Sequence, residues 1–239
     1  MLPNILSLSL LTATVLVASG CSTIQHPGDF SEASGPTLAQ LKRIPVHLFM
    51  SSTEAGTAVH LGNNHLLTCK HLLTGSVVEI DGVLTGYTII ASGQDETFEE
   101  DWVVIRVLNV SIQSPSILDD WEPHQRSKDG QSAWIIGFWA EGQTDLTPAE
   151  VRQIEKTFVK AQVKYPPTSP SKNLIYLVAP ASDTYRGLSG APVMVWDPEK
   201  ERMDFVGIYT GSEEYSFFLW YEVRHLVREF NSAMAQGLQ

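Results

Sequence analysis

The sequence predicts an all-β fold built from two successive sets of short strands. From about residue 44 onward, apolar and polar residues alternate with a period of two, and turn signals recur at short intervals. The 17 glycines and 13 prolines suit frequent turns, and a polar connector at 111–131 separates two halves of similar texture. Many short strands in two runs indicate either two β-barrels or a sandwich.

The first half contains two predicted hairpins followed by a buried strand. Gly-Asn-Asn at 62–64 and Asp81-Gly82 each separate two apolar runs, and Asp-Gly is a strong hairpin signal. Residues 102–107 form a mostly β-branched apolar run interrupted only by Arg106, which is typical of a buried strand. The predicted strands of this half are 56–61, 65–68, 76–80, 83–90 and 102–107.

The second half adds strands and two predicted helices. Thr147-Pro148-Ala149-Glu150 has the form of a capping box with proline at the first helical position, so a short helix is expected at 148–156. Apolar residues at helical spacing predict a C-terminal amphipathic helix at 221–235. The predicted strands of this half are 133–139, 157–165, 173–179, 191–196, 203–210 and 216–220.

Charge and composition exclude one class of partner. Acidic residues outnumber basic ones by 27 to 16, giving a net charge of −11. Nucleic-acid binding needs clusters of basic side chains, so no nucleic-acid partner is expected. The residues imply no metal and no organic cofactor.

The N-terminal segment has the features of an export signal. Residues 5–18 are mostly apolar and too short to span a bilayer comfortably, and small residues precede Cys21. The segment 16–21 resembles the lipobox of bacterial lipoproteins, which implies cleavage before Cys21, lipidation of its thiol and anchoring in the bacterial cell envelope. The first four residues contain no lysine or arginine, so an ordinary secretory signal is the alternative. Residues 21–43 are predicted to be a flexible tether.

The sharpest chemical motif is Gly-Leu-Ser-Gly-Ala-Pro at 187–192. A nucleophilic serine needs an exposed hydroxyl and backbone N–H groups directed at the developing oxyanion. Glycines on either side of Ser189 permit the tight turn, and the amides of Gly187 and Ser189 are the candidate oxyanion donors. Alone, such a string is usually only a turn.

Two further residues complete a candidate catalytic set. His71 follows an apolar strand, where a histidine can serve as general base. Asp101 directly precedes the buried strand at 102–107, where an acid can accept the imidazole Nδ1–H and fix its tautomer. Each residue is weak evidence alone, and Asp95, Glu99 and Glu100 compete with Asp101.

Taken together, the motifs at 56–58, 67–71, 101–104 and 187–192 resemble the trypsin-like serine proteases. The order His71, Asp101, Ser189 is that of the family, with separations of 30 and then 88 residues. The resemblance implies two six-stranded antiparallel β-barrels and a C-terminal helix. It places the first barrel at about 44–120 and the second at about 121–220, whereas the lipobox resemblance places the signal peptide at 1–20.

The resemblance also implies how substrate is bound. The strand containing Ile208, Tyr209 and Thr210 would line the cleft and pair with the substrate backbone. Asp183, six residues before Ser189, would lie at the base of the pocket for the residue before the scissile bond and favour arginine or lysine there. Aspartate often caps a turn, so a small or apolar specificity is the alternative.

The sequence departs from the family pattern around both reactive residues. Cys69 and Lys70 replace small residues before His71, and a lone thiol at position 69 is expected to be a buried packing residue. Leu188 replaces the acidic residue found before the serine in zymogen-activated members. Without that carboxylate, activation by insertion of a new N-terminus is not expected.

The sequence therefore predicts a serine endopeptidase that is anchored in the bacterial envelope and acts on proteins or peptides. A protease-like binding module that has lost turnover is the main alternative, and an envelope lipoprotein of unrelated β fold is the other.

Overall fold

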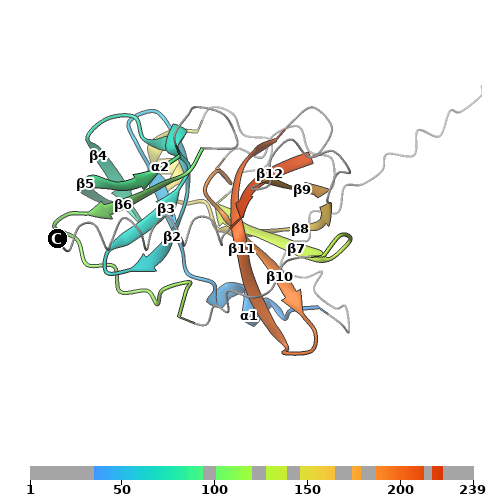
Figure 1. The fold of residues 1–239 in the computed structure, drawn as a ribbon. Coiled ribbons are helices and arrows are strands. Elements are labelled where there is room, and N and C mark those ends of the chain that lie inside the picture. The colour runs from blue at the N-terminus through green and yellow to red at the C-terminus, as the bar shows by residue number, and fades with distance from the viewer. Residues whose placement is uncertain are drawn as a thin grey trace, which may run out of the picture.

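The computed structural model describes residues 35–93, 101–119, 128–138, 146–164, 174–178, 187–212 and 217–222. These residues form two closed six-stranded barrels that lie side by side (Figure 1). The all-β, double-barrel architecture expected from the sequence is thus confirmed. Within the described ranges, no helix is long and apolar enough to cross a bilayer.

Both barrels have the same strand order, although the sequence shows no repeat. In each, the six strands in chain order are hydrogen-bonded as first, second, third, sixth, fifth, fourth, and the fourth closes on the first. The first barrel contains β1 (Val46–Met50), β2 (Ala55–Gly62), β3 (His65–Thr68), β4 (Val77–Ile80), β5 (Val83–Ser92) and β6 (Val103–Val107). The second contains β7 (Ser132–Phe138), β8 (Lys156–Lys164), β9 (Leu174–Val178), β10 (Pro192–Asp197), β11 (Arg202–Ser212) and β12 (Phe217–Glu222).

The predicted hairpins form because their turn residues tolerate positive φ. Asn63 and Asn64 have φ of 49° and 60° between β2 and β3, and Asp81 and Gly82 have 49° and 86° between β4 and β5. Two-residue hairpin turns that match the strand twist need positive φ at both central positions. Asparagine, aspartate and glycine adopt it at low cost, so the turn sequences position these strands.

The helices differ from expectation. Helix α1 (Leu38–Arg43) lies within the predicted tether, because Thr37 and Gln40 form a capping box and Leu41 is fully buried. Helix α2 (Pro148–Val151) has the predicted cap but ends five residues early, because Lys156 already pairs with Phe138 in the β7–β8 ladder. The predicted C-terminal helix begins at 221, where β12 still continues to Glu222; the rest of it lies outside the described residues.

One apolar core joins the two barrels. Phe49 and Val104 of the first barrel belong to the same buried cluster as Ile136, Met194 and Ile208 of the second. Burying such a side chain contributes about 1.5–3 kcal/mol, so separating the barrels would expose many stabilising contacts. The shared core therefore holds fixed the surfaces that meet between the barrels.

Candidate active site

The β3–β6 ladder brings His71 and Asp101 together. Thr68, the last residue of β3, pairs with Val103, the first residue of β6. His71 lies just after the end of β3, in the 3₁₀ turn η1 (Lys70–Leu72). Asp101 lies just before the start of β6. The two residues are 30 apart in sequence but become neighbours at one end of the barrel.

The Asp101 carboxylate holds the histidine at two points. Its Oδ2 lies 2.5 Å from His71 Nδ1, and its Oδ1 accepts a 2.9 Å hydrogen bond from the His71 backbone N–H. The Asp101 side chain is 10% exposed, whereas that of His71 is 43% exposed. Accepting the Nδ1 proton leaves Nε2 as the basic nitrogen, on a ring that solvent and substrate can reach.

Ser189 lies on a tight turn before β10 that two glycines make possible. Gly187 and Gly190 have φ of 92° and 81°, a region that favours glycine. The turn is closed by a 2.8 Å hydrogen bond from Ala191 N to Leu188 O. Within the part of the chain that the structure describes, no hydrogen bond uses the amides of Gly187 and Ser189. These are the two donors expected to bind an oxyanion.

Thr57 of β2 joins this turn to the first barrel. Its backbone N–H donates to Ser189 O at 2.8 Å, and its hydroxyl donates to Gly187 O at 3.1 Å. The same hydroxyl accepts the Phe138 N–H at 3.2 Å. Thr57 is fully buried, so these bonds act in a dry environment, where losing one partner is costly. Sequence analysis gave Thr57 no role beyond its place in a motif.

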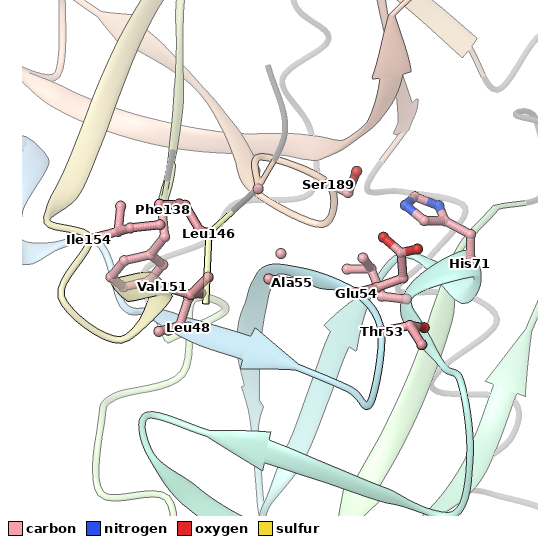
Figure 2. A pocket seen from close by; sticks show the side chains of 13 residues that line it. Leu48, Thr53, Glu54, Ala55, His71, Phe138, Leu146, Val151, Ile154 and Ser189 are labelled. Carbon is pink, nitrogen blue, oxygen red and sulfur yellow. The ribbon is translucent and has the colours of Figure 1, made fainter. Parts of the chain in front are cut away.

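Ser189 and His71 line one pocket of about 420 Å³ between the barrels. Figure 2 shows the Ser189 side chain and the His71 imidazole directed toward one another, with the Glu54 carboxylate below them. Toward its other end the pocket is lined by apolar side chains of Leu48, Phe138, Leu146, Val151 and Ile154. Glu54 could not be predicted as a pocket residue from the sequence, because no local signal links the turn before β2 to the histidine.

Cys69 is a buried thiol beneath the site, as expected. It is fully buried, and its Sγ donates to Tyr209 O at 3.3 Å, the same carbonyl that accepts the Gly190 N–H at 2.8 Å. Ligand atoms of Cys69, His71 and Asp101 lie within 4.8 Å of one another. Burial raises the pKa of the Cys69 thiol well above its usual value, so it stays protonated and is a poor metal ligand.

A second Asp–His–Ser chain lies outside the pocket. His47 Nδ1 is 2.6 Å from Asp81 Oδ2, and His47 Nε2 is 2.8 Å from Ser114 Oγ. The amide two residues before Ser114, which corresponds in position to that of Gly187, already donates from Ile112 N to Asn64 Oδ1 at 3.0 Å. Ser114 therefore lacks one of the two amide donors that Ser189 has among the described residues, and its bonds attach the connector to the first barrel.

Comparisons with known proteins identify the fold. No family model and no curated protein matches the sequence. Among solved structures, the Rv3671c protease of M. tuberculosis in an inactive form is 15% identical, with a TM-score of 0.54 over 80% of this chain and 89% of that one. Mouse neuropsin, a serine protease, is 13% identical with a TM-score of 0.58 over 82% and 96%. This is the trypsin-like double barrel.

The same fold also occurs without activity. A scabies mite inactivated protease paralogue is 15% identical to this chain, with a TM-score of 0.59 over 82% of this chain and 96% of that one. At such identities the trypsin-like likeness concerns the fold alone.

The other predicted site residues differ in backbone pairing and burial. Ile208 pairs with Pro192 on one side and Tyr221 on the other. Tyr209 N donates to Ala191 O at 2.8 Å, so at both positions the β11 backbone is already used within the second barrel. Thr210 is buried, and β11 continues beyond it to Ser212. Cys21 and Asp183 lie outside the described residues.

Proposed function

We propose that this chain is a serine endopeptidase that hydrolyses peptide bonds through an acyl-enzyme on Ser189. One observation carries the proposal: a histidine held by a buried aspartate shares a pocket with a serine whose own amide and that of Gly187 make no hydrogen bond within the described residues. Ser114 shows that an Asp–His–Ser chain can also serve structure alone. What supports Ser189 as the reactive serine is that its amide and that of Gly187 have no partner among the described residues, whereas the Ile112 amide before Ser114 donates to Asn64 Oδ1.

The first half of the reaction forms the acyl-enzyme. His71 Nε2 accepts the Ser189 Oγ proton as Oγ attacks the scissile carbonyl carbon. Asp101 keeps the Nδ1 proton in place and stabilises the imidazolium that forms. The carbonyl oxygen, now negatively charged, accepts hydrogen bonds from the amides of Gly187 and Ser189. His71 then donates its Nε2 proton to the leaving amine as the C–N bond breaks.

The second half repeats these roles with water as the nucleophile. His71 takes a proton from water, the hydroxide oxygen attacks the ester carbon, and the proton returns to Ser189 Oγ as the acid product leaves. No step requires a metal or an organic cofactor.

Substrate residues before the scissile bond pair with the end of β11, from Thr210 toward Ser212. This assignment is supported by the length of β11, which extends past its last pair with β10 at Ile208 and Pro192. Adding a strand there would direct the acyl half of the peptide along the second barrel. Asp183 as the group that selects a basic residue on this side remains a prediction.

The enzyme is tethered to the bacterial cell envelope through lipidated Cys21. The proposal is supported by the apolar segment 5–18 and the small residues before the cysteine. Several acyl chains on one residue would anchor it stably, because a single chain binds only marginally. The barrels would then act on proteins or peptides near the membrane surface.

A fluorophosphonate probe tests the catalytic proposal directly. We expect the probe to label wild type on Ser189, and Ser189→Ala to abolish labelling and lower turnover by on the order of 10⁶-fold. Ser114→Ala is the matched control, because Ser114 also bonds to a histidine held by an aspartate. This variant should still be labelled on Ser189. Labelling that persists in Ser189→Ala would contradict the assignment. A folded wild type that no such probe labels would favour a binding module.

A further inference from the structure

The pocket beside Ser189 has an acidic end and an apolar end. Of the 13 residues that line it, Glu54 is the only one with a carboxylate, and Figure 2 shows it next to His71 and Ser189. Farther from the reactive pair, the walls become apolar. These two ends would favour two different substrate side chains, one cationic and one bulky and apolar.

The acidic end is fixed by its turn and open to a partner. The backbone of Glu54 is held on both sides, since Ser51 N donates to Glu54 O at 2.8 Å and Glu54 N donates to Ser51 Oγ at 3.2 Å. Its side chain is exposed, and among the described residues no basic group pairs with it. A substrate ammonium or guanidinium could therefore bind this carboxylate without displacing an existing ion pair.

The apolar end is a formed wall rather than a loose surface. Leu48 and Val151 pack together, and the partly buried Phe138, Leu146 and Ile154 complete the cluster. Covering these exposed portions with a substrate side chain would remove apolar surface from water, at about 25 cal/mol for each Å².

A bidentate ion pair across the barrels holds this wall in place. Arg152, directly after α2, donates from Nε and Nη2 to the two carboxylate oxygens of Glu79, each at 2.6 Å. Glu79 belongs to β4 of the first barrel, whereas α2 connects strands of the second. Figure 1 shows α2 beside the first barrel. Such planar, two-point contacts fix orientation as well as distance, so the wall is preorganised for an occupant.

The position of the pocket relative to Ser189 decides which part of a substrate it meets. The turn that contains Ser189 is hydrogen-bonded to β11 on one side and to β2 on the other. Gly190 N donates to Tyr209 O, and Thr57 N donates to Ser189 O. If the substrate residues before the scissile bond follow β11, the residues after that bond must lie over the start of β2. Glu54 and Ala55 are at that start, so the pocket faces the half that departs with the amine.

We infer that this pocket selects the leaving-group side of the substrate, with a basic residue facing Glu54 next to the scissile bond and a bulky apolar residue beyond it against Leu146, Val151 and Ile154. The inference rests on the proposed peptidase activity for the direction of the peptide. It gives the substrate class as peptide bonds followed by a basic and then a large apolar residue. It is independent of Asp183, which concerns the acyl side.

Peptide binding to the full-length Ser189→Ala protein tests the inference without turnover. Four dye-labelled peptides with a common tail would begin Arg-Leu, Arg-Ala, Ala-Leu and Ala-Ala, and fluorescence anisotropy would give their Kd values. Leucine at the second position should tighten binding by about tenfold or more, from the apolar area that it buries. Arginine at the first position should tighten it by about threefold, as expected of a solvent-exposed ion pair, and less at high salt.

Matched variants in the same background assign each effect to its end of the pocket. Glu54→Gln should remove the arginine advantage and keep that of leucine, whereas Leu146→Ala should do the reverse. Glu199→Gln makes the same charge change at the far end of β10, and Leu84→Ala makes the same truncation at a 70% exposed site on β5. Both controls should keep both preferences.

Four equal affinities would overturn the inference, as would equal effects of Glu54→Gln and Glu199→Gln. Failure of fluorophosphonate labelling is a separate outcome, because it removes the catalytic proposal and leaves these affinities unaffected. The two ideas therefore fail on different measurements.

Discussion

Replacing Thr57 by valine tests whether the first barrel sets the geometry of the nucleophile turn. Valine keeps the shape of threonine and its backbone bond to Ser189 O, but it removes the hydroxyl. Two bonds are lost, the 3.1 Å donation to Gly187 O and the 3.2 Å bond accepted from Phe138 N. Thr57→Ser is the matched control, because it keeps the hydroxyl and removes only a methyl group.

The size of the effect follows from what is left unpaired. An unsatisfied buried polar group costs about 1–3 kcal/mol, and Gly187 and Phe138 are only half-buried, so a total loss of about 2 kcal/mol in the free energy of unfolding is expected. Without its bond to Thr57, the Gly187 carbonyl no longer fixes the position of the Gly187 amide, which is one of the two proposed oxyanion donors. We expect kcat/KM to fall by about 10- to 100-fold, less than the roughly 10²–10³ that removal of a donor costs.

Urea unfolding and turnover of a chromogenic peptide would measure both effects. Thr57→Ser should stay near wild type in stability and in rate. If Thr57→Val matched Thr57→Ser in both measurements, the hydroxyl would not position the turn. The first barrel would then have no part in preorganising the oxyanion site.

Three other predictions concern packing, ionisation and the anchor. Gly190→Ala should abolish activity, because its Cβ would lie 2.1 Å from Thr57 O at a φ of 81°; near-normal turnover would contradict the geometry. Burial lowers the pKa of Lys156 to about 8, so the folded state releases this proton before the unfolded chain does. In urea unfolding, the stability of wild type relative to Lys156→Met should therefore rise between pH 8 and about 10. A stability difference that does not change with pH would refute the lowered pKa of Lys156. Cys21→Ser should move the protein out of the membrane fraction or block its processing; unchanged fractionation and migration would exclude acylation.

The fold could be predicted because its signals are local. Asn63, Asn64, Asp81 and Gly82 adopt the positive φ that two-residue hairpins need, so the turns could be located from residue type alone. The helix ends were less predictable. The cap of α2 is encoded in four adjacent residues, but its early end depends on Lys156 pairing with Phe138, 18 residues away in the chain.

The residues of the candidate site also differ in whether their contacts could be predicted from the sequence. His71 and Asp101 flank strands whose pairing follows from their patterns, so their contact could be expected from the sequence. Thr57 could not be given its role, because its partners Gly187 and Phe138 lie 130 and 81 residues away. The wall beside the site depends on Arg152 meeting Glu79, 73 residues apart, and no local pattern signals such a pair.

Comparison of the two serines shows which structural feature distinguishes Ser189 from Ser114. Ser114 and Ser189 each belong to an Asp–His–Ser set, and the His47–Asp81 distance of 2.6 Å is nearly the His71–Asp101 distance of 2.5 Å. A proton relay alone therefore does not separate a structural hydroxyl from a nucleophile. The difference lies in the backbone: among the described residues the amides of Gly187 and Ser189 make no hydrogen bond, whereas the equivalent amide before Ser114, that of Ile112, donates to Asn64 Oδ1. Because the proposed acyl-enzyme reaction places negative charge on the carbonyl oxygen, we expect these amides to decide which of the two serines is the nucleophile.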